Sequence, residues 1–155
     1  MAFRISGLPR APFEPYFRLS DAELLARGAR RYVADGQRAF PCRVSMRDCN
    51  PGERVILLSY EHQAADSPYR ASGPIFVREN ADETSSPVDH VPDPLRARPL
   101  SVRAYDAAGL IVDAEVIPGS ELEPLIGRLF ERDDTAYLHV HHARYGCYHC
   151  RIDRA

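Results

Sequence analysis

The stretch Leu100-Ser-Val-Arg-Ala-Tyr105, followed by Asp106-Ala-Ala-Gly109 and then Leu110-Ile-Val-Asp-Ala-Glu-Val-Ile117, decides the fold class. Two apolar runs flank a short turn that ends in glycine, which is typical of antiparallel strands joined by a hairpin. The sequence therefore predicts a β-hairpin over residues 100–117.

Further strands are indicated on both sides of this hairpin. Apolar or alternating runs predict strands at residues 3–6, 42–46, 54–61 and 75–78, and a final hairpin over 135–142 and 147–152. The signature Ser20-Asp-Ala-Glu23 is a capping box that opens a helix ending near Arg31, and Ser120-Glu-Leu-Glu123 opens another that runs to about Glu131. We expect one α+β domain over residues 1–155, with an antiparallel or mixed sheet and two main helices packed on it.

Residues 80–99 differ in kind from the rest of the chain. They contain four prolines, at positions 87, 92, 94 and 99, among acidic and hydroxyl residues. A loop this long in a compact domain is commonly functional or mobile. We expect a mobile segment or lid here.

Composition excludes several classes of function. All 20 basic residues are arginine, so Schiff-base chemistry with pyridoxal phosphate and phosphate-loop lysines are excluded. The net charge of −2 argues against a nucleic-acid partner. No glycine-rich dinucleotide fingerprint is present.

The chain also lacks membrane and secretion signals. No apolar run approaches the roughly 18 residues that a membrane helix needs, and residues 1–7 resemble no signal peptide. We expect a cytoplasmic protein without a membrane partner. Its four cysteines should then be reduced, either free or bound to metal.

The segment His139-Val-His-His142 carries the clearest candidate for metal chemistry. In a strand, His139 and His141 point to one face, while Leu138 and Val140 point to the other. Two such imidazoles can hold one transition metal such as Zn, although a polar sheet face is the alternative.

Cysteines stand close to these histidines. Cys147-Tyr-His-Cys150 has the spacing of a metal or redox motif, but residues three apart on a strand face opposite ways. A hairpin in which His142 pairs with Cys147 brings Cys150 to His139, and a one-residue slip brings Cys147 there instead. Either register predicts a thiol among imidazoles.

A second constellation precedes residue 80 and continues in the central hairpin. It comprises His62, Tyr69, Arg70 and, further along the chain, Arg103. Arginines in such positions can clamp a carboxylate or phosphate through parallel hydrogen bonds. Salt bridges with the 22 acidic residues are the alternative.

Several strings together resemble a bacterial family of single-domain proteins of unknown function of about this length. They are Phe40-Pro-Cys-Arg43, Tyr60-Glu-His62, Ser67-Pro-Tyr-Arg70, Ile75-Phe-Val-Arg78 and Tyr137-Leu-His-Val-His141 with Gly146-Cys-Tyr148. The resemblance implies a single domain and no assigned activity. It also implies that Cys42 and Cys147 belong to family motifs, whereas Cys49 and Cys150 do not.

Three hypotheses follow for the function. The first is an enzyme or binder for a small anionic molecule, with His62, His141 and Cys147 as catalytic candidates and Arg70, Arg103 and Tyr69 as ligand-binding candidates. The second is a transition-metal protein that uses His139, His141 and a cysteine. The third is a non-catalytic interaction or oligomerisation module.

Overall fold

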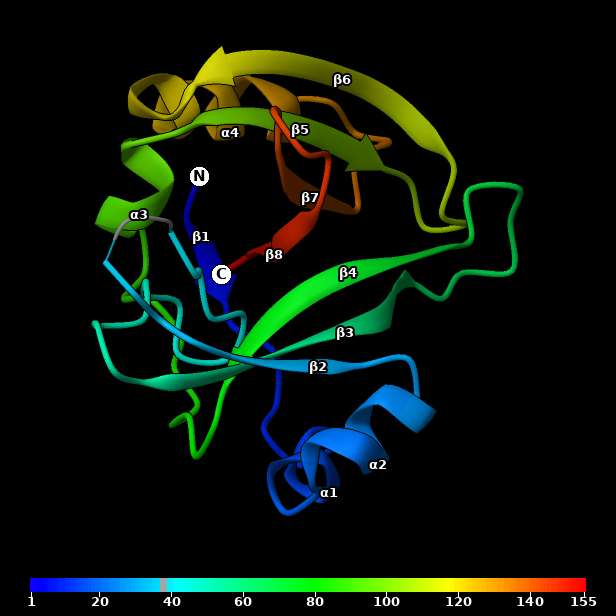
Figure 1. Ribbon diagram of the computed structural model, residues 1–155. Coiled ribbons are helices and arrows are strands. Elements are labelled where there is room, and N and C mark those ends of the chain that lie inside the picture. The colour runs from blue at the N-terminus through cyan, green and yellow to red at the C-terminus, as the bar shows by residue number, and fades with distance from the viewer. Residues whose placement is uncertain (37–38) are drawn as a thin grey trace.

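A computed structural model describes residues 1–36 and 39–155 and shows two antiparallel sheets with a few short helices (Figure 1). The strands are β1 (Phe3–Ser6), β2 (Arg30–Val33), β3 (Arg54–Gln63), β4 (Ala71–Arg78), β5 (Pro99–Tyr105), β6 (Ile111–Pro118), β7 (Tyr137–His142) and β8 (Tyr148–Arg154). The helices are α1 (Glu14–Phe17), α2 (Asp21–Ala26), α3 (Asp93–Arg96) and α4 (Leu122–Phe130), with a 3-10 helix, η1 (Gly119–Glu121), before α4. None of these helices is both long and apolar enough to cross a membrane.

The larger sheet has the strand order β1-β8-β7-β5-β6, and the smaller has the order β2-β3-β4. The predicted hairpins at β5–β6 and β7–β8 are confirmed, and every strand pair is antiparallel. The predicted α+β class with antiparallel pairing is confirmed, but the prediction of one sheet with two main helices packed on it is not. Strands predominate, and the helices are short, with six residues in α2 and nine in α4.

Helix α4 covers one face of the larger sheet because its apolar side chains follow helical spacing. Leu122, Ile126 and Leu129 are buried against the inward residues of β5 and β7. The opposite face of this sheet turns toward the smaller sheet, and a second core cluster joins Tyr148 of β8 to Ile56 of β3. Figure 1 shows β5, β6 and α4 above, with β2, β3 and β4 below.

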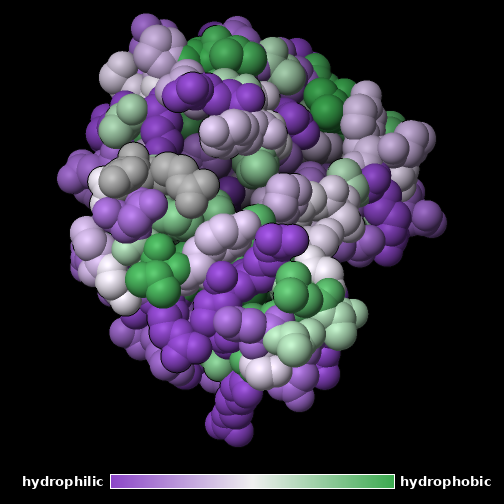
Figure 2. Space-filling view, in the orientation of Figure 1, coloured by the Kyte–Doolittle hydropathy of each residue, from purple (hydrophilic) through white to green (hydrophobic). Residues whose placement is uncertain are grey.

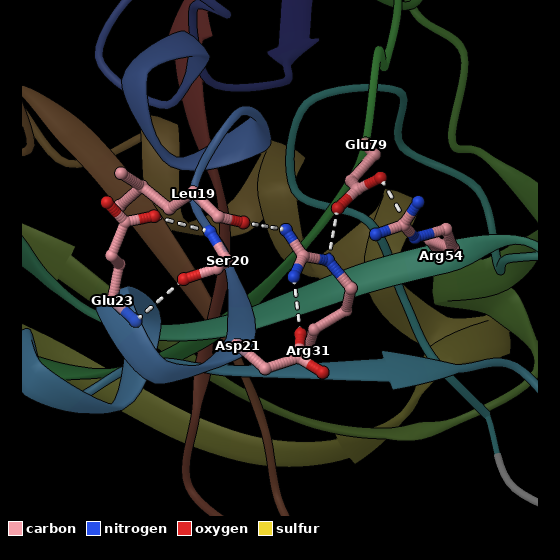
Figure 3. Close-up of polar contacts among 7 residues, drawn as sticks. All are labelled: Leu19, Ser20, Asp21, Glu23, Arg31, Arg54 and Glu79. Carbon is pink, nitrogen blue, oxygen red and sulfur yellow. Dashed lines mark hydrogen bonds and ion pairs between the residues drawn. The ribbon is translucent and has the colours of Figure 1, made fainter.

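The first predicted helix is shorter than expected. Ser20 and Glu23 form the predicted capping box, but α2 ends at Ala26, and Gly28 at φ +72° turns the chain into β2. Arg31 therefore lies in a strand instead of at a helix end. Its guanidinium bonds to Asp21, Glu79 and the Leu19 carbonyl, which ties α2 to the smaller sheet (Figure 3).

One predicted strand and one predicted helix cap were wrong, although the helix expected to run to about Glu131 is present as α4. Residues 42–46 form a turn, because the Cys42 amide donates to the Arg47 carbonyl and Met46 adopts φ +57°. The second capping box does not form: η1 occupies its place, and the side chain of Glu121 makes no cap hydrogen bond to α4.

Within residues 80–99, the stretch 84–89 lies along β1, residues 93–96 form α3, and Pro99 begins β5. The amides of Ser86 and Asp89 donate to the carbonyls of Ile5 and Phe3, and Val91 and Leu95 are fully buried. These are the contacts of a packed segment, although its mobility stays a prediction.

Hydrogen exchange should separate packing from mobility in this segment. We expect the Ser86 and Asp89 amides to exchange slowly, because both are hydrogen-bonded to β1, while the exposed stretch 82–85 exchanges quickly. Protection throughout 80–99 equal to that of Val55–Leu58 would exclude a mobile lid. Rapid exchange at Ser86 would show that the contact with β1 opens readily.

Candidate functional site

Three histidines from two sheets converge between the sheets. His139 and His141 come from β7, and His62 comes from β3. One ring nitrogen of each residue lies within 4.8 Å of the other two. The ring centroid of His62 is 5.0 Å from that of His141 and 6.3 Å from that of His139. We call these residues the histidine cluster.

The strand geometry explains how the cluster is assembled. Leu138 and Val140 are fully buried in the core under α4, so the alternation of β7 turns His139 and His141 to the other face. On β3 the register with β4 shifts between Glu61 and Gln63, which makes a bulge at His62. Bulges re-aim side chains, and this one lets β3 present His62 toward β7.

Each ring of the cluster has a buried nitrogen without a hydrogen-bond partner among the described residues. These atoms are Nδ1 of His62, Nδ1 of His139 and Nε2 of His141. His141 Nδ1 lies 2.9 Å from the carbonyl oxygen of Gly146. A carbonyl can only accept, so Nδ1 carries the proton and Nε2 holds a free lone pair.

Burial keeps the cluster neutral at pH 7. It lowers the pKa of His139 to about 3, with smaller effects from His141 and His62. It also lowers the pKa of His141 to about 4, and it lowers that of His62. A neutral imidazole is the form that binds a metal ion.

Aromatic rings wall the cluster. Tyr148 stacks on His62 with ring centroids 5.3 Å apart and planes 6° apart, and it meets the edge of His139 at 5.2 Å. Burial raises the pKa of Tyr148, so its phenol stays protonated. Next to them, Tyr137 shares a hydrogen bond of 3.0 Å with the buried amide of Gln63. These contacts hold the rings in fixed orientations.

A pocket of about 450 Å³ opens beside the cluster. Its lining includes two of the histidines, three tyrosines and several polar side chains from β1, β3, β7 and β8. The lining residues are Ser6, Gly7, Leu8, Tyr60, Glu61, His62, Gln63, Ala64, Ala65, Tyr137, His139, Tyr148, Arg151 and Asp153. The pocket is large enough for a small molecule.

The predicted arginines take different places. Arg103 lies directly opposite His139 in the pairing of β5 with β7. Arg70 stands outside the pocket lining, exposed, and binds the carboxylate of Glu61 and the carbonyl of Ala64. Tyr69 is 43% exposed and meets the ring edge of Tyr105. Strand pairing thus places Arg103 beside the cluster, and none of Arg103, Arg70 and Tyr69 is among the residues that line the pocket.

Neither of the two predicted registers of the β7–β8 hairpin holds along its whole length. His142 does pair with Cys147, through an N–H to carbonyl bond of 2.9 Å. A bulge at His149 then shifts the register, so that Tyr148 lies opposite His141 and Arg151 opposite His139. Cys150 faces the apolar core instead of the histidines.

Cys147 is partly exposed in the hairpin loop. Among the described residues, its thiol is not one of the atoms that converge with the histidine cluster. Its thiol faces the Tyr145 carbonyl at 3.9 Å. All four cysteines are free. The histidine cluster therefore contains no thiol.

Alkylation should distinguish the four thiols. We expect Cys147 to react first at pH 7, because Cys42 and Cys150 are buried and burial raises the pKa of Cys49 to about 12. Mass spectrometry after a short exposure to iodoacetamide would locate the modification. Cys147→Ser should remove the fast phase, and equally fast labelling of Cys42 would contradict the structure.

A second pair of histidines lies outside the cluster. His142 Nε2 and His149 Nδ1 are 2.7 Å apart, and burial lowers both pKa values. Nearby, the buried guanidinium of Arg43 donates to the carbonyls of Tyr148 and Pro41. The contact between His142 and His149 lies at the bulge of β8.

The sequence predicted one polar pocket that includes His62, Arg70, Arg103, His139, His141 and Cys147, but its metal hypothesis used only His139, His141 and a cysteine, without His62. It missed Gln63, Tyr137 and Arg151, all of which line the pocket. Only Tyr137 had a signal, since it lies at i−2 from His139 on the same strand face. His62 and His139 belong to different sheets, so spacing along the chain could not reveal their contact.

The fold and site define a two-sheet α+β protein with a histidine cluster beside a small pocket. A family model described as a protein of unknown function, DUF1203, matches residues 39–154, about three-quarters of the chain. The chain belongs to this family. Searches of curated proteins and of solved structures found no match. The cluster, Arg103 and Cys147 all lie within the matched range.

Proposed function

We propose that this protein binds one transition-metal ion through His62, His139 and His141, and that the metal acts on a small molecule held in the adjoining pocket. The observation that carries the proposal is the convergence of three ring nitrogens within 4.8 Å, in residues that each hold a buried, unpartnered nitrogen.

Buried polar atoms in proteins normally have hydrogen-bond partners, and leaving one without a partner costs about 1–3 kcal/mol. If the cluster were purely structural, three such atoms in adjacent rings would lower the free energy of unfolding of the protein. A metal ion satisfies one nitrogen of each ring at once. Zinc–nitrogen bonds of about 2.0–2.1 Å in tetrahedral geometry place the nitrogens about 3.3 Å apart, so small ring movements suffice.

The surroundings of His141 support a ligand role. Metal-bound histidines usually donate the other ring N–H to a carbonyl or carboxylate, which fixes the tautomer. The bond from His141 Nδ1 to the Gly146 carbonyl has this form. It directs the lone pair of Nε2 away from the backbone.

Three neutral imidazoles favour a first-row ion such as Zn²⁺, and they leave one coordination position for water or a substrate. His62 takes the place that the sequence-based hypothesis gave to a cysteine. An ion held by these three residues would supply a bound water acidic enough to act as a nucleophile near neutral pH. The pocket, lined by His62 and His139, gives a small molecule access to that position.

An interaction module is the competing hypothesis, and it predicts that the polar residues pair with one another. The unpartnered nitrogens of the cluster favour the metal instead. On the face drawn in Figure 2, hydrophobic residues form small separate patches among hydrophilic ones. Such a face supports a localised site better than a broad apolar docking surface.

Elemental analysis tests the proposal directly. Protein purified without chelator should carry close to one equivalent of a transition metal, and the chelated protein should take up one equivalent again. A metal at 100-fold excess over its Kd stabilises the fold by about 2.7 kcal/mol. For a chain of this size that raises Tm by about 5–10 °C. Protein that binds no transition metal, with an unchanged Tm, would overturn the proposal.

A further inference from the structure

The side chain of Arg103 makes no hydrogen bond or ion pair with the described residues. It lies on β5 directly opposite His139, with Ser101 opposite His141. Its neighbours Val102 and Ala104 are fully buried under α4, so the alternation of β5 turns Arg103 to the face that carries the histidine cluster. Strand pairing thus puts Arg103 next to His139, on the sheet face that carries the proposed metal site.

The charge of Arg103 is not compensated within the described residues. In residues 1–36 and 39–155 it makes no hydrogen bond and no ion pair. Arg151 provides the contrast, because it flanks His139 on the opposite side, through β8. Arg151 is paired with Asp153 at 2.8 Å and lies over the Tyr137 ring at 3.9 Å.

The carboxylates that line the pocket are already engaged. Glu61 binds Arg70, and Asp153 binds Arg151. The positive charge of Arg103 reaches all three rings of the cluster, since it contributes to the lowered pKa of His62, His139 and His141. The site therefore combines three neutral ligands with one unpaired cation.

A divalent metal would add two positive charges to this arrangement. Repulsion between the metal and a guanidinium in a partly dehydrated site is costly unless a negative group lies between them. Carboxylates and phosphates are suited to that place, because one oxygen can bind the metal while others accept from the guanidinium.

We propose that the molecule handled at this site is a small oxyanion, a carboxylate or a phosphate, bound between the metal and Arg103. This inference rests on the metal site proposed above. It assigns Arg103 the role of anchoring the substrate, and it gives Arg70 none.

Cobalt-substituted protein offers the test. The visible absorption of Co²⁺ changes when its open position is filled, so acetate and inorganic phosphate can be titrated separately. We expect Arg103→Gln to weaken binding of the better anion about 10- to 100-fold, the value of one charge-assisted contact. Arg128→Gln is the matched control, since Arg128 lies on α4 at the other face of the larger sheet, exposed and paired with Glu115, and its loss should leave the anion affinity unchanged.

Metal affinity separates substrate anchoring from structural damage. Without added anion, Arg103→Gln should bind Co²⁺ as tightly as the wild type or more tightly, because a repulsive charge is gone. Arg103→Lys, which keeps the charge but loses the fork, should retain part of the anion affinity.

Failure of this inference can be told from failure of the metal site. If the wild type binds no Co²⁺, the proposed metal site is wrong and the inference falls with it. If Co²⁺ binds but neither anion changes its spectrum, or Arg103→Gln binds the better anion as tightly as Arg128→Gln does, the metal site stands and the role of Arg103 is overturned.

Discussion

Replacing His141 by alanine should abolish tight binding of a transition metal. Loss of an outer-shell partner alone costs roughly 10- to 100-fold in metal affinity, so loss of a direct ligand should cost more. His141 is the sharpest choice, because its bond to Gly146 leaves Nε2 as the free nitrogen. Isothermal titration with Zn²⁺ of chelated protein measures the effect.

The matched control is His90→Ala. His90 is exposed and lies outside the cluster, so its loss should leave both the stoichiometry and the affinity unchanged. His62→Ala provides a second site variant, which is only half-buried and so disturbs the core less than His141→Ala. Retention of full zinc affinity by both His62→Ala and His141→Ala would contradict the three-histidine site.

Acid should unfold the metal-free protein at a pH well above the pKa of its carboxyl groups. His139 and His141 are buried with pKa values lowered to about 3 and 4, whereas an unfolded histidine titrates near 6.5. Unfolding therefore takes up protons once the pH falls below about 6.5. The stabilising effect of keeping these rings neutral is complete above that pH and is lost as the pH falls toward 4.

The expected size is large for a domain of marginal stability. Each such group lowers the free energy of unfolding by up to about 1.4 kcal/mol per pH unit, so two of them remove up to about 5 kcal/mol between pH 6.5 and 4.5. Total stabilities are commonly about 5–15 kcal/mol. Urea unfolding at several pH values measures the slope.

Two variants test whether the buried histidines cause the dependence of the free energy of unfolding on pH. His139→Phe replaces a buried imidazole by a ring that cannot take up a proton, so the dependence on pH should become shallower. His90→Ala removes an exposed histidine and should leave the slope unchanged. If the free energy of unfolding stays constant from pH 6.5 to 4.5, burial does not lower the pKa values of these histidines, and this prediction is wrong.

Local sequence patterns predicted the parts of the fold that local contacts determine. The hairpin over residues 100–117 and the alternation at Leu138 and Val140 depend on neighbours along one strand or across one turn. The face on which His139 and His141 lie was predicted for the same reason. The end of α2 was predicted wrongly, because Gly28 turns the chain before Arg31, where the helix was expected to end.

The rest of the site depends on departures from regular strands. The bulge at His149 sends Cys150 into the core and brings Tyr148 and Arg151 to the face of the histidines. The bulge near His62 lets a strand of the smaller sheet reach the same place. No spacing along the chain signals either bulge, since a bulge is decided by packing between strands. That is why the sequence suggested a cysteine where the structure has His62.

The pairing of β1 with β8 has a consequence during synthesis. Phe3–Ser6 forms an edge of the larger sheet, and its partner is the last strand of the chain, Tyr148–Arg154. At the usual rates of translation, β1 waits about 7–30 s for that partner to be made. A strand of four residues that carries Arg4 and Ser6 offers little surface for wrong pairing during this delay. The larger sheet therefore stays incomplete during synthesis until residues 148–154 have left the ribosome.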